Sequence, residues 1–148
     1  MLRSSVTAFR LTKTGGIVLM GSLGTKGGCC CHLSVSPDGR WLGATNHAPD
    51  PDVPDVPAAN TNGSVALISL DPQTGGLLAL TDHVVHAPPS DPAMLRHPDR
   101  DDHTPHAHSA SWAPSGRFLF VCEKARRCAC HSTFHTLIPT LGGSFEHT

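Results

Sequence analysis

A nine-residue pattern that occurs twice decides the fold of this chain. Ser34-Val-Ser-Pro-Asp-Gly-Arg-Trp-Leu42 returns as Ser111-Trp-Ala-Pro-Ser-Gly-Arg-Phe-Leu119, an offset of 77 residues. Both copies place Pro-x-Gly-Arg between two short apolar runs, and proline suits the first central position of a tight reversal. The pattern therefore predicts two β-hairpins, with strands over 33–36 and 41–45 in one and over 110–113 and 118–122 in the other.

A second pair of segments predicts a second type of hairpin. Phe9-Arg-Leu-Thr-Lys-Thr-Gly-Gly-Ile-Val-Leu19 is echoed by Ile68-Ser-Leu-Asp-Pro-Gln-Thr-Gly-Gly-Leu-Leu-Ala-Leu80. Glycine in these turns supplies the positive φ that tight hairpins require. Side chains alternate along a strand, so the first strand has two faces. These faces are formed by Thr7, Phe9 and Leu11 and by Val6, Ala8 and Arg10.

The two hairpin types alternate along the chain, which indicates a repeating unit of four strands. Such a unit, with frequent turn signals and no amphipathic helix, is typical of a β-propeller or another β array. We predict an all-β partial propeller over 1–123, with one complete blade over 32–86 between two half blades. A Cys/His-containing tail over 124–148 continues neither repeat, and we expect it to be poorly ordered.

Composition limits the partners and the compartment. The 148 residues carry 11 Lys+Arg against 12 Asp+Glu, a net charge of −1, which argues against a nucleic-acid partner. No apolar run reaches the roughly 18 residues that a membrane-spanning helix needs. Three of the six cysteines are consecutive, at 29–31, so they do not form a disulfide framework. The cytoplasm is the simpler location, although the basic, acid-free segment before Asp38 also resembles a mitochondrial transit sequence.

Four segments resemble the lactonase family of seven-bladed β-propellers, which includes 6-phosphogluconolactonase and the carboxymuconate-cyclising enzyme. They are His32–Leu42, Asn62–Ala66, Leu70–Leu78 and Pro105-His-Ala-His-Ser109. The resemblance covers about 6–123, and Pro-His-Ala-His-Ser is its most specific motif. It implies hydrolysis of 6-phosphogluconolactone in the pentose phosphate pathway, with a sugar lactone as partner and with no metal or other cofactor.

The chain holds only about two of the seven blades that this resemblance implies. A propeller protects its sheet edges by closing its circle, and two blades cannot close. We therefore expect open sheet edges and a fragment of the complete enzyme. Self-association through those edges is one way to cover them. We also expect no strand directly after Cys122, where the pattern of the complete blade would place one.

His106 and His108 are the candidate catalytic residues. They occur at i and i+2 immediately before the innermost strand of a blade, and in a strand that spacing puts two imidazoles on one face. A neutral imidazole there is suited to take a proton from water that attacks a lactone carbonyl. Cys29 and Cys31 occupy the equivalent positions one blade earlier, so the histidine pair is not required by the scaffold. The alternative is that each histidine caps the strand.

The resemblance also implies two substrate-binding residues. It places an arginine in the loop before Pro105, and Arg100 is our candidate, with Arg96 as the alternative. A guanidinium is well shaped to hold a phosphate or a carboxylate. His32 resembles a recurrent histidine at the start of an inner strand. The competing interpretation of Arg100 is a solvent-exposed charge in a loop. The competing interpretation of His32 is a hydrogen-bonded histidine at the end of a strand.

Two other functions remain open. Cys128, Cys130, His131 and His135 offer zinc ligands in a short span, but Cys-x-Cys is closer than the usual spacing of zinc-finger cysteines. We assign no metal ligands on this basis. The other alternative is an inactive propeller fragment or an interaction module without catalysis.

Overall fold

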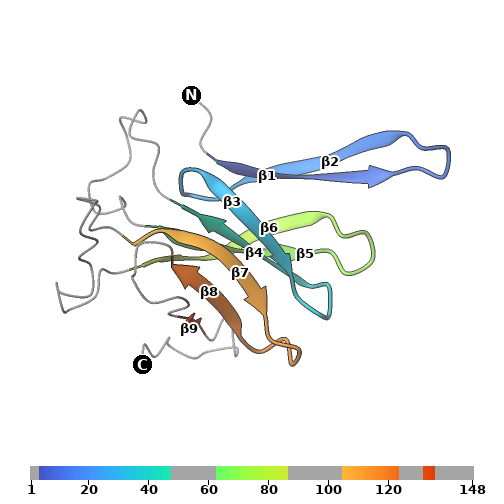
Figure 1. Cartoon of the computed structure of the whole chain (residues 1–148). Helices are drawn as coiled ribbons and strands as arrows, with labels where there is room; N and C mark the ends of the chain where they lie inside the picture. Colours follow the sequence, from blue (N-terminus) through green and yellow to red (C-terminus); the bar gives the residue numbers. More distant parts are fainter. Residues whose placement is uncertain (1–3, 48–62, 87–104, 124–131, 136–148) are drawn as a thin grey trace, which may run out of the picture.

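The computed structural model describes residues 4–47, 63–86 and 105–123, together with the backbone of 132–135. These residues form three antiparallel sheets and no helix, so none of them could cross a membrane as a helix (Figure 1). The first sheet contains β1 (Ser5–Leu11) and β2 (Ile17–Gly24). The second contains β3 (Cys30–Val35), β4 (Trp41–Asn46), β5 (Ser64–Leu70) and β6 (Leu77–Val85). The third contains β7 (Ala107–Trp112), β8 (Leu119–Glu123) and β9 (Ser132–His135).

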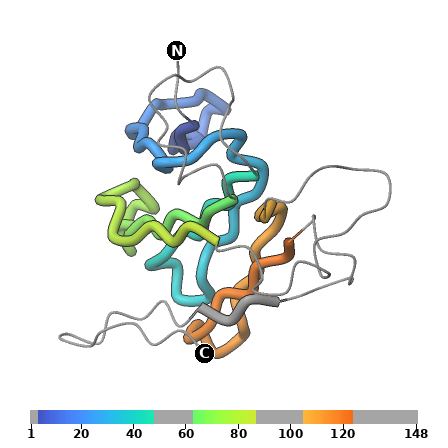
Figure 2. The backbone as a smooth tube through the Cα atoms, turned by 90° about the vertical axis from the view of Figure 1, so that its left-hand side faces the viewer, coloured from blue at the N-terminus to red at the C-terminus, as the bar shows by residue number. Residues whose placement is uncertain are grey.

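The predicted all-β class and the predicted order of hairpins are confirmed. β1 and β2 form the outer half of a blade, β3 to β6 form a complete blade, and β7 and β8 form the inner half of the next. Figure 2 shows the three sheets following one another in chain order. The repeat in the sequence is therefore a repeat in space, in which β7–β8 correspond to β3–β4 and β1–β2 correspond to β5–β6.

The turn of the complete blade shows why the nine-residue pattern folds as a hairpin. Asp38 accepts hydrogen bonds from the Ser36 hydroxyl at 2.6 Å and from the backbone N–H of Arg40 at 3.1 Å. Ser36 also accepts a bond from the N–H of Trp41, the first residue of β4. Gly39 supplies the positive φ of 70° that closes the reversal.

Two apolar clusters hold the sheets against one another. The cluster between the first and second sheets contains Val6, Leu42, Ala44, Ala66, Ile68 and Leu70. The cluster between the second and third sheets contains Val65, Leu67, Ala107, Ala110, Leu119 and Val121. The second sheet contributes to both clusters, because neighbouring residues of β5 point to opposite faces. For this reason most residues of β5 are apolar, without the alternation of a strand that has one solvent-exposed face.

The third sheet differs from our prediction at one point. We expected no strand after Cys122, but β9 pairs antiparallel with β8, with Cys122 opposite Ser132. A short segment can form a strand when an open edge offers backbone partners, even where its own sequence carries no strand signal. Most of 124–148 lies outside the described residues, so the proposed tail stays a prediction.

Candidate functional site

Side chains that could take part in catalysis or binding gather at one edge of the sheets. β3, β5 and β7 begin at this edge and β2, β4, β6 and β8 end there, whereas the tight turns lie at the opposite edge (Figure 1). Where many strand ends converge, residues far apart in the sequence become neighbours. The predicted histidines all lie toward this edge.

β3 and β7 each contain a β-bulge at the same position in the blade. The register of β7 against β8 shifts at His108, and the register of β3 against β4 shifts at Cys31. These two residues are related by the offset of the sequence repeat. The Cys31 sulfur lies 3.3 Å from the carbonyl oxygen of His108, so the two bulges also contact each other. The bulge is therefore a feature of the repeated backbone, and at the bulge position the two blades differ only in the side chain.

His106 and His108 converge on a third imidazole, His47, which sequence reasoning missed. The rings of His47 and His106 stack with their centroids 4.5 Å apart, and His108 approaches His47 edge-on at 5.9 Å. His106 precedes the first residue of β7 and is buried, while His108 is exposed. The bulge at His108 interrupts the regular alternation that the i, i+2 spacing assumes, and both rings contact His47.

Hydrogen bonding orients the His106 ring. Its Nδ1 lies 2.9 Å from the carbonyl oxygen of His47, whose own N–H donates to the carbonyl of Cys29. A carbonyl can only accept, so Nδ1 carries the proton in this bond. In neutral His106, Nε2 is then the nitrogen with the basic lone pair.

A glycine allows the chain to enter β7 closely against β5. The N–H of Gly63 donates to the carbonyl of Pro105 at 2.5 Å. A Cβ at Gly63 would lie 2.2 Å from the backbone nitrogen of Ala107, so no larger residue fits without displacing the backbone. This contact fixes the segment that carries His106 and His108.

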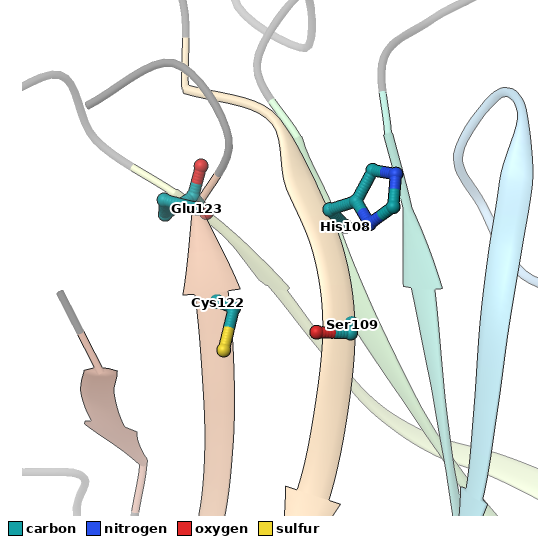
Figure 3. Close-up of a pocket in the computed structure, with 4 residues that line it drawn as sticks. All are labelled: His108, Ser109, Cys122 and Glu123. Atoms are coloured by element: carbon teal, nitrogen blue, oxygen red, sulfur yellow. The ribbon is translucent and has the colours of Figure 1, made fainter. Parts of the chain in front are cut away.

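A cavity of about 260 Å³ opens beside His108. It is lined by His108, Ser109, Cys122 and Glu123, which come from β7 and β8 (Figure 3). The Glu123 side chain is buried, and no described residue donates a hydrogen bond to its Oε2. A buried carboxylate oxygen with unused acceptor capacity can receive a hydrogen bond from a ligand.

The other oxygen of Glu123 contacts the Nδ1 atom of His86, and the repeat shows what is unusual about this pair. One blade earlier the same positions hold Thr25 and Asn46, and Thr25 Oγ1 donates to Asn46 Oδ1 at 2.7 Å. Asn46 also donates to Ser64, so both ends of its amide are used. The second interface thus replaces a neutral, satisfied pair by an ionisable one.

Of the two predicted substrate-binding residues, only His32 is described, and it does not line the cavity. The backbone N–H of Ala110 donates to Nδ1 of His32 at 3.3 Å, so this ring helps to hold β3 against β7. Arg100 and its alternative Arg96 lie outside the described residues. Their roles remain predictions.

The environment of His83 disfavours its charged form. Its Nε2 lies 3.0 Å from the hydroxyl oxygen of Ser64. Burial and the nearby positive charge of Lys26 lower the pKa of His83, and the negative charge of Asp82 opposes them. His83 is therefore a structural imidazole of the second sheet.

The described residues contain no group of three His, Cys, Asp or Glu side chains placed to hold a metal ion. The zinc alternative rested on Cys128, Cys130 and His131, which lie outside the described residues, and on His135, where the structure describes backbone only. It stays untested. The described cysteines are free thiols at positions 29, 30, 31 and 122. Burial and the neighbouring Cys31 raise the pKa of the Cys30 thiol, which disfavours its thiolate.

Comparisons with known proteins agree with this architecture. Among solved structures, the chain is similar to the periplasmic gluconolactonase PpgL of Pseudomonas aeruginosa, with a TM-score of 0.63 and 22% sequence identity. The match covers 89% of this chain but only 31% of that protein, so the chain spans about a third of the structure that it matches. No curated protein sequence matches it. The family model "Lactonase, 7-bladed beta-propeller" matches residues 2–125. The predicted partial propeller is thus confirmed, and the chain belongs to the lactonase family of seven-bladed β-propellers.

Proposed function

We propose that this chain carries part of a lactone-hydrolysing site, in which His108 is the general base. The observation that supports this most directly is the cavity, which brings an exposed imidazole and a buried carboxylate to the same surface. Membership of the lactonase family supports the reaction class. The printed name of the similar structure, a gluconolactonase, supports a cyclic ester of a sugar acid as substrate.

The residues present can perform both proton transfers of ester hydrolysis. The imidazole of His108 accepts a proton from water while the water oxygen forms a bond to the lactone carbonyl carbon. The bond between that carbon and the ring oxygen then breaks, and the imidazolium returns the proton to the departing alkoxide. The product is an open-chain hydroxy acid. Stacking on His47 makes His106 a positioning residue in this scheme, or the base if its Nε2 reaches the water.

Glu123 has a separate role in this proposal. Its Oε2 accepts a hydrogen bond from a sugar hydroxyl, while its other oxygen is held by His86. A buried acceptor of this kind discriminates strongly against analogues that lack the hydroxyl. Glu123 therefore orients the sugar rather than transferring the proton.

Recognition of a 6-phosphate is the finer part of the proposal. It rests on the resemblance that points to Arg100, because a guanidinium pairs with phosphate through parallel hydrogen bonds. A cytoplasmic location is proposed on the free thiols of the described cysteines, although the similar structure is named as periplasmic.

The decisive experiment measures hydrolysis of gluconolactone and 6-phosphogluconolactone by the full chain, corrected for spontaneous hydrolysis. His108→Ala should lower kcat by about 10²–10⁴-fold, the usual contribution of general acid–base catalysis. Cys31→Ala is the matched control, because it changes the equivalent bulge residue, whose sulfur contacts the backbone carbonyl of His108 and leaves the imidazole in place, and it should retain activity. A folded chain without turnover, or equal losses in both variants, would contradict the proposal. Faster hydrolysis of 6-phosphogluconolactone than of gluconolactone would support recognition of the phosphate if Arg100→Ala abolishes the difference.

An interaction module without catalysis is the second candidate. It is favoured by a specific observation, the large apolar side chains that remain exposed on the first and second sheets. A folded chain that associates but never turns over either lactone would favour this candidate.

A further inference from the structure

The two ends of the described fold are complementary halves of one structural unit. The first sheet is an outer half blade, β1–β2, and the third sheet begins with an inner half blade, β7–β8. We propose that β7–β8 of a second copy of this chain complete the first blade, with β8 of that copy paired along β1. This arrangement repeats an interface that the chain already contains, because β4 pairs along β5 in the complete blade.

The edge of β1 supports this assignment. β5, the counterpart of β1, has a strand on each side, β4 and β6. Within the described part of the chain, β1 pairs only with β2. An open edge of this kind is a ready acceptor for a strand from another chain.

Apolar residues of β3 lie exposed where the inner half blade would pack. Leu33 is 49% exposed and Val35 is 55% exposed. Their counterparts one blade later, Ala110 and Trp112, belong to or pack against the cluster between the second and third sheets. Trp41 packs on that same cluster, and Phe118 is its counterpart. Phe118 of a second copy would therefore cover Leu33 and Val35 as Trp41 covers their counterparts.

The same placement covers a second exposed patch, on the face of β1–β2 that points away from the second sheet. Thr7 and Ser22 share this face, as the hydrogen bond between their hydroxyls shows. The patch consists of Phe9, Leu11, Ile17 and Leu19, which are 58–74% exposed. The corresponding residues of the complete blade are Ile68, Leu70, Leu77 and Leu80, which contribute to the cluster against the first sheet. The second sheet of the second copy, including its exposed Leu78, would lie over the patch.

The proposed association would also close the cavity. Ser109 is the counterpart of His32, which contacts the following sheet in the complete blade. The cavity beside His108 thus lies on the face of β7–β8 that would meet β3 of the other copy. Any effect of this closure on catalysis rests on the proposed function, whereas the association itself does not.

β9 occupies the edge of β8 that this pairing needs. The strand has four residues, against the seven of β1, so β1 of another copy would replace it. β9 is then a competitor that weakens association.

Light scattering coupled to size-exclusion chromatography of the full chain, over a dilution series, tests the proposal. The wild type should show a concentration-dependent mass above the 15.6 kDa of one chain. Leu33→Asp damages only the acceptor end and Leu78→Asp only the donor end, so each variant alone should be monomeric. Because head-to-tail contacts are heterologous, mixing the two variants should restore a dimer that stops at two copies. Val18→Asp, an exposed apolar residue on the other face of the hairpin, is the control and should associate like the wild type.

Three results would overturn the proposal. One is a wild type that is monomeric throughout the dilution series. Another is a Leu78→Asp variant that still dimerises while Leu19→Asp does not, because this indicates back-to-back pairing of two β1–β2 faces. The third concerns β9: Thr133→Pro should strengthen association by removing a backbone donor from the competing strand, and weaker association would exclude pairing at β8. Circular dichroism of each variant establishes that the sheets are retained.

Discussion

Glu123 stands one blade after Asn46 at the same position, and it contacts the imidazole of His86 where Asn46 contacts the hydroxyl of Thr25. Both pairs join the residue after an outer strand to the last residue of the second strand in the next blade. The geometry of the blade interface is therefore kept while its chemistry changes from neutral to ionisable. At the second interface Oε2 of Glu123 receives no hydrogen bond from a described residue.

This substitution can be tested by exchanging one pair for the other. His86→Thr alone leaves a buried carboxylate without its imidazole and should lower the free energy of unfolding by about 3–5 kcal/mol. The double variant His86→Thr, Glu123→Asn recreates the neutral pair and should recover part of this loss, with a coupling of about 0.5–3 kcal/mol. Urea denaturation of the wild type, both single variants and the double variant measures it. Additive effects would show that the two side chains do not interact.

Gly63→Ala should be the most damaging glycine substitution at the site edge. The added Cβ would meet the backbone nitrogen of Ala107 at 2.2 Å, and backbone cannot rotate away as a flexible side chain does. We expect a loss of about 1–3 kcal/mol or more in unfolding free energy. Gly24→Ala is the matched control, because nothing lies within 4 Å of its Cβ position. Similar denaturation midpoints for the two variants would exclude the close approach of β5 to β7.

His83 should make the fold less stable in mild acid. Burial and Lys26 lower the pKa of His83 below the ordinary value of 6.5. Between the two pKa values, His83 is therefore protonated in the unfolded chain but neutral in the folded chain. Its contribution to stability is thus present above pH 6.5 and is lost as pH falls toward the lowered pKa. His83→Gln should reduce the loss of unfolding free energy between about pH 7.5 and about pH 5.5.

The variant Lys26→Met provides the control for His83. Removing the positive charge should raise the pKa of His83 and reduce the same pH dependence by a smaller amount, because burial is the larger cause. An unchanged pH dependence in His83→Gln would show that other groups cause the acid sensitivity.

The tight turn before β4 should lose its stabilising contribution at a lower pH than His83 does. The Ser36 hydroxyl and the Arg40 N–H lower the pKa of Asp38 below its ordinary 3.8. The stabilisation is therefore present above pH 3.8 and disappears as pH falls through the lowered pKa. Asp38→Ala should flatten the dependence of Tm on pH in this window. Ser36→Ala removes the largest cause and should flatten it as well, whereas a curve parallel to that of the wild type would argue against the interaction.

The fold could be predicted from the sequence where turns and strands repeat together. Pro-Asp-Gly-Arg fixed the position of the β3–β4 hairpin because Asp38 and Gly39 satisfy the turn locally, and the second copy fixed β7–β8 in the same way. β9 could not be predicted, because its pairing depends on the open edge of β8 and not on its own residues.

The site was predictable only in part, for a related reason. Pro105-His-Ala-His-Ser109 pointed to His106 and His108, but a contact across sheets brings His47 to them and another brings His86 to Glu123. No local pattern marks His47 or His86. Glu123 could have been found by applying the repeat offset to Asn46. The sequence alone does not show which of these two side chains has an oxygen without a hydrogen-bond donor. The bulge at His108 was invisible, because it depends on how two strands align.

That bulge has a consequence for how such chains change over time. A bulged residue stands outside the hydrogen-bonded ladder, so its side chain can be replaced without moving the register of the sheet. Cys31 and His108 show two outcomes of this freedom at one position. Each duplication of a blade thus creates a new place, at the same rim, where chemistry can vary while folding is preserved. An array built in this way can acquire or lose reactive groups blade by blade.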